Sequence, residues 1–269
     1  MNHSNMDNLQ RWISHSPMSD PGRYLEKITA LSSDVGSVIC LIQGLLVHGD
    51  LAAEYGLDPA KLSPTVRKTL SMVERLQDVL QRDVRPFEAE RPPERRSLGT
   101  CRDFALMLCS ILRCHGVPSR IRCGFAAYFG AQWEDHWVCE YWDAKTGLWL
   151  LGDPQLDRMI TSRNAIRFDP IDVPRSDFLT AGEAWLGCRS GQFDSRNFGH
   201  GDVTGLWSVK INVWRDHYAL NAKETSEWDR WRKAPLTKRT VHAHEIAWLD
   251  DLAAHPEQKL REVVPHWLT

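Results

Sequence analysis

The sequence predicts an α+β fold, in which a layer of helices precedes an antiparallel sheet along the chain. Apolar residues recur every three or four positions over residues 23–82 and again after Cys101, a spacing typical of amphipathic helices. Polar and apolar residues then alternate from Ile121 to Phe125, and strand-like sequence resumes at His136. Helices followed by neighbouring strands, rather than strands that alternate with helices, are typical of the α+β class.

The N-terminal part divides into a tail and a helical layer. We expect residues 1–22 to form a mobile tail and residues 23–96 to form a helical layer with its linker. Asp20 and Pro21 supply an N-cap and a proline for the first turn of a helix.

Further start and stop signals lie inside this layer. Asp34 and Gly36 interrupt the helical spacing, so we expect a break there. Ser63 and Pro64 mark a second helix start. The segment 83–96 is rich in proline and charge and predicts an exposed connector.

Residues 97–160 form the expected core. A helix opens at Cys101 and ends near Gly116, because glycine is a common C-terminal residue of helices. Beyond the strand around Ile121, two further strands, 136–142 and 148–152, flank the turn DAKTG and predict an antiparallel hairpin.

Residues 161–269 form the expected, mainly helical C-terminal extension, packed on the core. One helix is marked by apolar residues at steps of four, three and four: Trp207, Ile211, Trp214 and Tyr218. Residues 241–254 and 256–263 suggest two more helices. The segment 187–205 holds five glycines and predicts a long loop, which we interpret as a candidate lid.

Composition excludes several classes of function. The 269 residues suit about one or two domains. The 33 basic and 35 acidic side chains give a net charge of −2, so the broad positive field that nucleic-acid binding needs is absent. No apolar run is long enough to span a bilayer, and because the N-terminus is polar we expect no secretory signal. The seven cysteines therefore predict free thiols in a cytoplasmic protein, with neither nucleic-acid nor membrane partners.

Three side chains in order suit nucleophilic catalysis on an amide. Cys101 begins a helix, where unpaired backbone N–H groups and the helix dipole favour a thiolate. His136 begins one strand of the hairpin and Asp153 follows the other, so a hydrogen bond between imidazole and carboxylate is geometrically simple. The sequence therefore predicts a Cys101–His136–Asp153 triad.

Other interpretations of these residues stay open. Asp153 precedes Pro154 and is also a common turn residue, so Asp143 and Asp157 are alternative orienting carboxylates. Glu140 shares the His136 face of its strand and suits either a partner of the histidine or a salt bridge. Four further cysteines suit inert core positions: Cys109, Cys114, Cys123 and Cys139.

The segments LGTCRDFALMLCSILRCHGVPSRIRCGF, from Leu98, and DHWVCEYWDAKTGLWLLGDPQLD, to Asp157, resemble the core of the transglutaminase-like superfamily. The resemblance implies a circularly permuted papain-like core, with the nucleophile helix packed on an antiparallel sheet and with helical N- and C-terminal extensions. It assigns the nucleophile to Cys101, the base to His136 and the orienting carboxylate to Asp153. One departure is Trp137, which follows the histidine directly where the family usually has a small residue and then a tryptophan.

The resemblance implies a cysteine-dependent amidase or peptidase that acts through a thioester on Cys101, with a peptide or small-molecule amide as substrate. Water as the acceptor gives hydrolysis, whereas an amine gives acyl transfer, so a transglutaminase-like acyltransferase is the alternative. A catalytically silent binding module of the same fold is a third reading. Oligomeric state is not predicted.

The sequence holds 12 tryptophans, which suit both cores and ligand clefts. We take four as candidate substrate contacts: Trp133, Trp137, Trp207 and Trp214. No metal or cofactor is expected, because the cysteines around His115 lack the spacing of zinc sites and no calcium-binding loop is present. His242 and His244 are two residues apart, which splits their rings on a helix.

Overall fold

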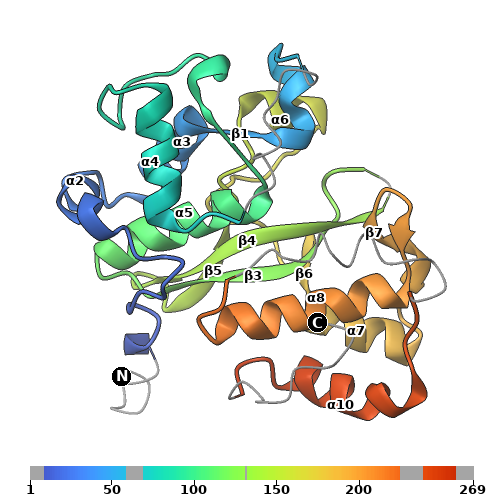
Figure 1. Ribbon diagram of the computed structural model, residues 1–269. Coiled ribbons are helices and arrows are strands. Elements are labelled where there is room, and N and C mark those ends of the chain that lie inside the picture. The colour runs from blue at the N-terminus through green and yellow to red at the C-terminus, as the bar shows by residue number, and fades with distance from the viewer. Residues whose placement is uncertain (1–8, 59–68, 131, 225–238, 259–269) are drawn as a thin grey trace. The chain divides into compact units, whose positions relative to one another are not determined.

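The computed structural model describes residues 9–58, 69–130, 132–224 and 239–258 (Figure 1). The chain divides into two compact units. The first comprises Met1–Ile121 and Trp137–Pro174, and the second comprises Arg122–His136 and Arg175–Thr269. The division passes through two strands, β3 (Ser119–Ala126) and β4 (Trp133–Asp143). The expected core of residues 97–160 therefore contributes to both units.

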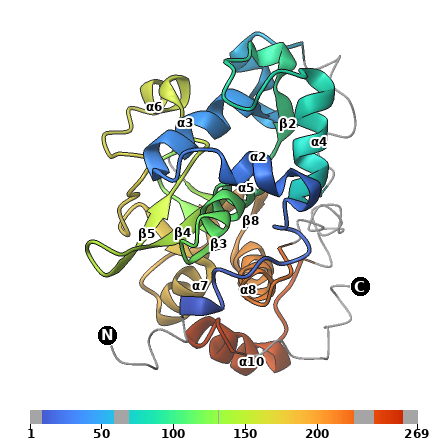
Figure 2. The ribbon, with the colours of Figure 1, turned by 90° about the vertical axis from the view of Figure 1, so that its left-hand side faces the viewer.

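The first unit is rich in helices, several of which Figure 2 shows around α5. Asp34 caps one of them, because its carboxylate accepts a hydrogen bond from the N–H of Ser37 at 2.9 Å, which explains the break expected there. Within the described residues, the helices of this unit include α2 (Leu25–Thr29), α3 (Val35–Leu45), α4 (Met72–Arg82), α5 (Cys101–Cys114) and α6 (Arg158–Arg163), with 3-10 turns at Gly22–Tyr24, Gly49–Tyr55 and Pro93–Arg95. The helix start expected at Ser63 and Pro64 lies outside the described residues.

Two short strands of the first unit pair with each other, and the second of them leads into α5. β1 (Leu46–His48) and β2 (Ser97–Gly99) pair in parallel, with Leu46 opposite Ser97. The sequence suggested no strand here, since three residues are too few to show alternation. A longer antiparallel pair joins β4 to β5 (Leu148–Gly152), with Cys139 opposite Gly152, and confirms the expected hairpin.

The described part of the N-terminal tail is packed, contrary to expectation. Trp12 is 6 % exposed, and its carbonyl oxygen accepts hydrogen bonds from the N–H of Ser119 at 3.0 Å and from Nε of Arg113 at 3.2 Å. The buried indole gives this segment an apolar anchor that its polar neighbours conceal in the sequence.

The proline-rich connector is ordered around one buried arginine. Arg91 is 0 % exposed, and its guanidinium donates to carbonyl oxygens of its own segment. These acceptors are the carbonyls of Asp83, Arg85, Pro86, Phe87 and Ala89. The connector is therefore a folded loop and not a loose linker.

In the second unit, the C-terminal part of β3 and the N-terminal part of β4 form a sheet with three short strands. The strand order is β6-β3-β4-β7-β8. The short strands are β6 (Phe178–Thr180), β7 (Phe198–His200) and β8 (Val203–Thr204). β6 pairs antiparallel with β3, and β7 pairs in parallel with β4, Trp133 opposite Phe198.

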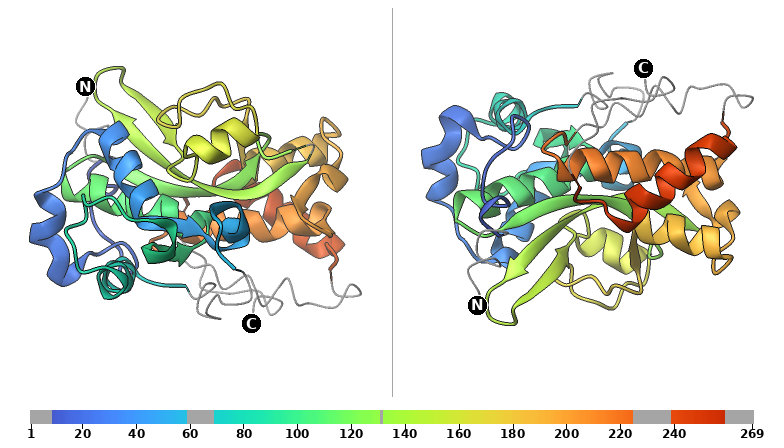
Figure 3. Two further views of the ribbon diagram at one scale, coloured as in Figure 1. Left: turned by 90° about the horizontal axis from the view of Figure 1, so that it is seen from above. Right: turned by 90° about the horizontal axis from the view of Figure 1, so that it is seen from below.

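Three helices of this unit pack on one another: α7 (Ala181–Ser190), α8 (Leu206–Leu220) and α10 (Ala243–Ala254) (Figure 3). α8 and α10 confirm two expected helices. The third, over 256–263, is not found at residues 256–258, and its remainder lies outside the described residues. The core between the elements includes Phe125, Trp185, Phe198, Trp214 and Leu249.

The expected long loop of residues 187–205 is instead largely structured. It contains the end of α7, a 3-10 turn at Ser195–Asn197, and both β7 and β8. Gly199 has a φ of +152°, and a Cβ there would lie 2.0 Å from the carbonyl oxygen of Val203. Glycine is thus needed at position 199 because β7 and β8 approach each other closely there. The sequence pattern does not distinguish this need from loop flexibility.

Candidate active site

Cys101 is the first residue of α5, and its side chain is partly exposed. The chain arrives in an extended conformation, with Thr100 at φ −117° and ψ 172°, and turns directly into the helix. The carboxylate of Asp103 accepts a hydrogen bond from the N–H of Thr100 at 2.8 Å, which caps the turn. The other N–H groups of the first turn point toward the N-terminal end of the helix, where Cys101 lies. Their partial positive charge favours a thiolate there.

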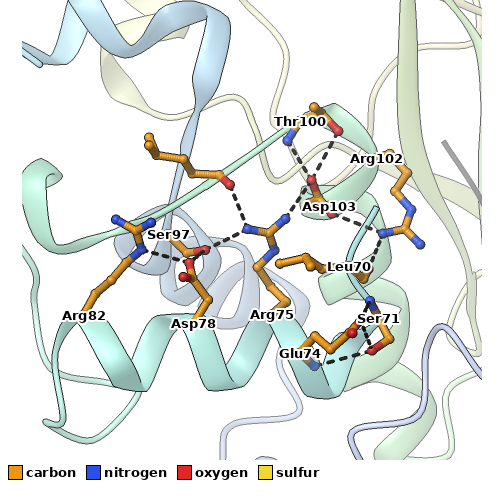
Figure 4. A network of polar contacts seen from close by, with 11 residues as sticks. Leu70, Ser71, Glu74, Arg75, Asp78, Arg82, Ser97, Thr100, Arg102 and Asp103 are labelled. Carbon is orange, nitrogen blue, oxygen red and sulfur yellow. Dashed lines mark hydrogen bonds and ion pairs between the residues drawn. The ribbon is translucent and has the colours of Figure 1, made fainter. Parts of the chain in front are cut away.

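Asp103 lies in a buried polar network at this turn (Figure 4). It is 4 % exposed and contacts the guanidinium groups of Arg75 and Arg102, each at 3.1 Å. Burial alone raises the pKa of the Asp103 carboxyl group, but the two guanidiniums and the Thr100 N–H outweigh it and hold the pKa below its usual range. Asp103 is therefore an ionised buried carboxylate two residues from the candidate nucleophile.

His136 lies in β4 and is 2 % exposed. The rings of Tyr128 and Phe129 meet its imidazole edge-on, with centroids at 5.8 and 4.9 Å. These contacts restrict rotation of the imidazole about its side-chain bonds. Glu134 lies two residues earlier on the same strand face and contacts His200 of β7.

Asp153 follows β5 and is 0 % exposed. Its N–H donates to the carbonyl of Pro170 at 2.8 Å, and its Oδ1 accepts from the N–H of Gln155 at 3.0 Å. Gly152, directly before it, adjoins α5, since a Cβ there would lie 3.0 Å from Cδ2 of Leu108. Cys101 and Asp153 thus belong to elements that pack together in the first unit, and His136 belongs to the second unit.

The alternative carboxylates have structural partners. Asp157 caps α6 by accepting from the N–H of Ile160 at 2.9 Å, and it also accepts from the hydroxyl of Tyr55 at 2.7 Å. Asp143 is part of the exposed turn and accepts from Thr146 Oγ1 at 2.7 Å. Both carboxylates thus stabilise local structure.

Glu140 is also committed to a structural partner. Nε of Arg120 donates to its Oε2 at 2.7 Å, and both side chains are nearly buried. The salt bridge, one of the two roles that the sequence left open for Glu140, is therefore formed.

The four candidate tryptophans lie in or against the interior. Trp137 and Trp214 are each 1 % exposed, and Trp207 is 9 % exposed. Trp214 packs on Trp248, with ring centroids 4.5 Å apart, and Trp133 stacks on Phe198 at 5.7 Å. Trp137 and Trp214 are therefore core residues by burial, which the sequence spacing alone does not separate from cleft residues. A substrate-contact role for the four tryptophans stays a prediction.

Sequence reasoning missed Arg75. Its guanidinium contacts both Asp103 and the residues before Cys101, although it comes from α4. A signal was present, because Arg75 shares the apolar face of that helix with Met72, Leu76 and Val79, and all four are buried. An arginine on an apolar helix face indicates a buried partner.

Within the described residues, no group of three or more His, Cys, Asp and Glu side chains is arranged to hold a metal ion. The rings of His242 and His244 stack on each other at 5.5 Å. No helix of the described chain has the length and apolar character needed to cross a membrane.

Comparison with known proteins finds a family model that matches this region. Residues 67–154 match the core model of the transglutaminase-like superfamily. A solved structure of a "putative cysteine protease" from Cytophaga hutchinsonii matches with 14 % identity and a TM-score of 0.39, over 58 % of this chain and 44 % of that chain. The match thus spans less than half the length of that protein. A comparison with curated proteins finds no match.

Proposed function

Since residues 67–154 carry a transglutaminase-like core, we propose that the protein is a cysteine-dependent amidase or peptidase with a Cys101–His136–Asp153 triad. The α+β architecture is the one expected of this family, with the helix α5 followed by the antiparallel strands β3, β4 and β5. The substrate class is an amide or peptide.

The observation that carries the proposal is the position of Cys101 among the cysteines of the matched region. Cys101 is partly exposed at a helix N-terminus, where a thiolate is favoured. Burial raises the pKa of Cys114 to about 11 and the pKa of Cys139 well above its usual range. Cys109 and Cys123 are 0 % exposed. Cys101 is therefore the thiol best suited to nucleophilic attack.

The proposed reaction begins with the thiolate of Cys101 and the imidazolium of His136. The sulfur attacks the amide carbonyl carbon, and the negative charge that develops on oxygen is stabilised by N–H groups of the α5 first turn. When the C–N bond breaks, His136 protonates the leaving amine, and a thioester remains on Cys101.

Water then attacks the thioester and gives a proton to His136, the C–S bond breaks, and the carboxylic acid leaves with the thiolate restored. Asp153 is proposed to hold the imidazole in the tautomer that both steps need. An amine in place of water gives a new amide, which is the acyltransferase alternative. The free thiols of this chain suit a reducing compartment such as the cytoplasm, which we include in the proposal.

The test is alkylation with limiting iodoacetamide across a pH series, with the modified cysteines mapped by mass spectrometry. We expect Cys101 to react well below the ordinary thiol pKa of about 8.5, and the exposed Cys40 serves as an internal reference. Replacement of His136 by Gln removes this low-pH reactivity if an ion pair causes it. Equal pH profiles for Cys101 and Cys40 in the natural protein would refute the proposal.

A second experiment distinguishes the reaction classes. p-Nitrophenyl acetate is supplied as an acyl donor, with and without methylamine, and products are identified by mass. Acetate alone in both cases supports hydrolysis, whereas N-methylacetamide that depends on Cys101 supports acyl transfer. Reaction of the Cys101→Ala variant at the rate of the natural protein would leave only a binding role.

A further inference from the structure

Cys101 lies between two short segments, and the position of its sulfur depends on the positions of both. The chain enters through β2 and leaves through the first turn of α5. One buried guanidinium, that of Arg75, reaches both segments (Figure 4). Its Nη1 donates to Oγ of Ser97 at 2.8 Å and to the carbonyl of Leu98 at 2.7 Å. Its Nη2 lies 3.1 Å from Oδ2 of Asp103, an ion pair whose angle falls outside hydrogen-bond geometry.

Asp103 carries this contact on to the residues that flank the sulfur. The same Oδ2 accepts from the N–H of Thr100 at 2.8 Å and from its hydroxyl at 3.2 Å. Oδ1 accepts from Nη1 of Arg102 at 3.1 Å, and that nitrogen also donates to the carbonyl of Leu70 at 2.6 Å. The residues immediately before and after Cys101 are thus both tied to this carboxylate.

We propose that Arg75 is a positioning residue of the reaction, which fixes β2 and the first turn of α5 on either side of Cys101 and so sets where the sulfur lies. The role rests on the proposed function. Arg75 acts through Asp103, Ser97 and Leu98, and it need not touch the substrate.

The network suits positioning better than bulk stability. Burying two guanidiniums and a carboxylate costs desolvation energy, and an apolar cluster of similar volume commonly stabilises a fold as well or better. A planar guanidinium that donates to two acceptors of β2 and pairs with a carboxylate of α5 instead restricts the relative placement of the two segments. A nucleophile needs such a placement, because small displacements from the reactive geometry cost large factors in rate.

The charges around the turn are balanced, so the negative charge of Asp103 does not destabilise a thiolate at Cys101. The carboxylate is offset by Arg75 and Arg102, and Asp78, which accepts from Ser97, is paired with Arg82 at 2.8 Å. Loss of Arg75 would leave the carboxylate of Asp103 with a single cation beside the reactive sulfur. Loss of Arg75 would therefore lower the reactivity of Cys101 in two ways, by displacing its sulfur and by electrostatic repulsion between Asp103 and the thiolate.

The test compares Arg75→Met and Arg75→Lys with the natural protein in iodoacetamide alkylation at pH 6 and pH 9.5. At pH 6 the reactivity of Cys101 depends on an ion pair held in position, so we expect its rate constant to fall about tenfold or more in Arg75→Met. Arg75→Lys keeps the charge but cannot keep both hydrogen bonds and the ion pair in one geometry, so we expect partial recovery. At pH 9.5, where thiols ionise without help, the variants and the natural protein should differ little.

The matched control is Arg163→Met, which removes an arginine of the same unit from an exposed pair with Glu54, a residue outside β2 and α5. It should leave the rate constant of Cys101 unchanged, and that of Cys40 should be unchanged in every variant. Circular dichroism verifies folding, and if Arg75→Met does not fold, Arg75→Lys decides alone through a fall of about threefold. Unaltered Cys101 reactivity in a folded Arg75 variant overturns the inference, whereas an unreactive Cys101 in the natural protein overturns the proposed function instead.

Discussion

Gly99 shows how closely the turn before Cys101 is packed. A Cβ at this position would lie 3.0 Å from Cβ of Asp103 and 3.1 Å from its Oδ2. Since Asp103 is held by its own network, it cannot yield without loss of the Thr100 contact. Glycine at position 99 is therefore a packing requirement of the cap and not a source of flexibility.

We expect Gly99→Ala to lower the free energy of unfolding by about 1–3 kcal/mol through overpacking. The matched control is Gly44→Ala in α3, where no atom lies within 4 Å of the new Cβ, so we expect a gain of up to about 1 kcal/mol. Urea denaturation followed by circular dichroism measures both. Equal effects of the two substitutions would contradict the close approach at Gly99.

Asp103 links stability to pH. Its pKa lies below that of an unfolded aspartate, about 3.9, so its contribution is complete above that value and is lost as the pH falls through the folded-state pKa. We expect Asp103→Asn to cost about 3 kcal/mol at pH 7, because Arg75 and Arg102 lose their buried partner. The difference from the natural protein should shrink below about pH 4. A difference that is constant from pH 7 to pH 2 in urea denaturation would contradict this account.

In the second unit, one buried ion pair joins a strand to a helix. Nε and Nη2 of Arg122 in β3 donate to the two carboxylate oxygens of Asp216 in α8, at 3.0 and 2.8 Å. Oδ1 of Asp216 also accepts from the N–H of Cys123 at 2.9 Å. The side chains of Arg122 and Asp216 are 8 % and 1 % exposed, so both charged groups are largely shielded from water.

We expect Arg122→Met to destabilise this unit by about 3–5 kcal/mol, because Asp216 would stay buried without its cation. Arg196→Met is the control: it removes an arginine from an exposed pair with Asp194, where the side chains are 85 % and 42 % exposed. The control should leave the melting temperature nearly unchanged. A comparable loss in both variants, measured by calorimetry, would show that the burial of the Arg122 pair carries no energetic weight.

The helices and strands that could be predicted are those with local signals. α5 is bounded by Thr100 and Gly116, and the β4–β5 hairpin turns at residues 143–147, so each signal lies within a few residues of the element it ends. β1 and β2 have no such signal. Each has three residues, and the partner strand lies far along the chain, so only tertiary structure creates them.

The candidate site divides in the same way. Cys101, His136 and Asp153 could be named because each is a reactive residue type at or near the end of a predicted element. Arg75 could not be distinguished from Arg82 by residue type, since both are arginines of one helix. Burial separates them, and burial depends on the packing of α4 against β2 and α5, to which the helix pattern gives only an indirect clue.

Across the whole chain, all seven cysteines are free, and they differ widely in exposure. Cys40 is exposed and Cys101 partly exposed. Burial raises the pKa of Cys114 and of Cys188 to about 11. Three further thiols are 0 % exposed: Cys109, Cys123 and Cys139. The cysteines lie in both units, so thiol reactivity reports on the native packing of each.

We expect a disulfide-exchange reagent such as Ellman's reagent, at pH 8 and without reductant, to modify Cys40 and Cys101 first. Cys114 and Cys188 should follow slowly, because little of either thiol is ionised at that pH. The three buried thiols should react only in denaturant, where the total reaches seven, the number in the sequence. A lower total would demonstrate a disulfide, and rapid native reaction at Cys109 or Cys139 would contradict the packing of α5 against β4. In the Cys40→Ser variant Cys101 should be the single fast thiol, so its rate follows the candidate site alone.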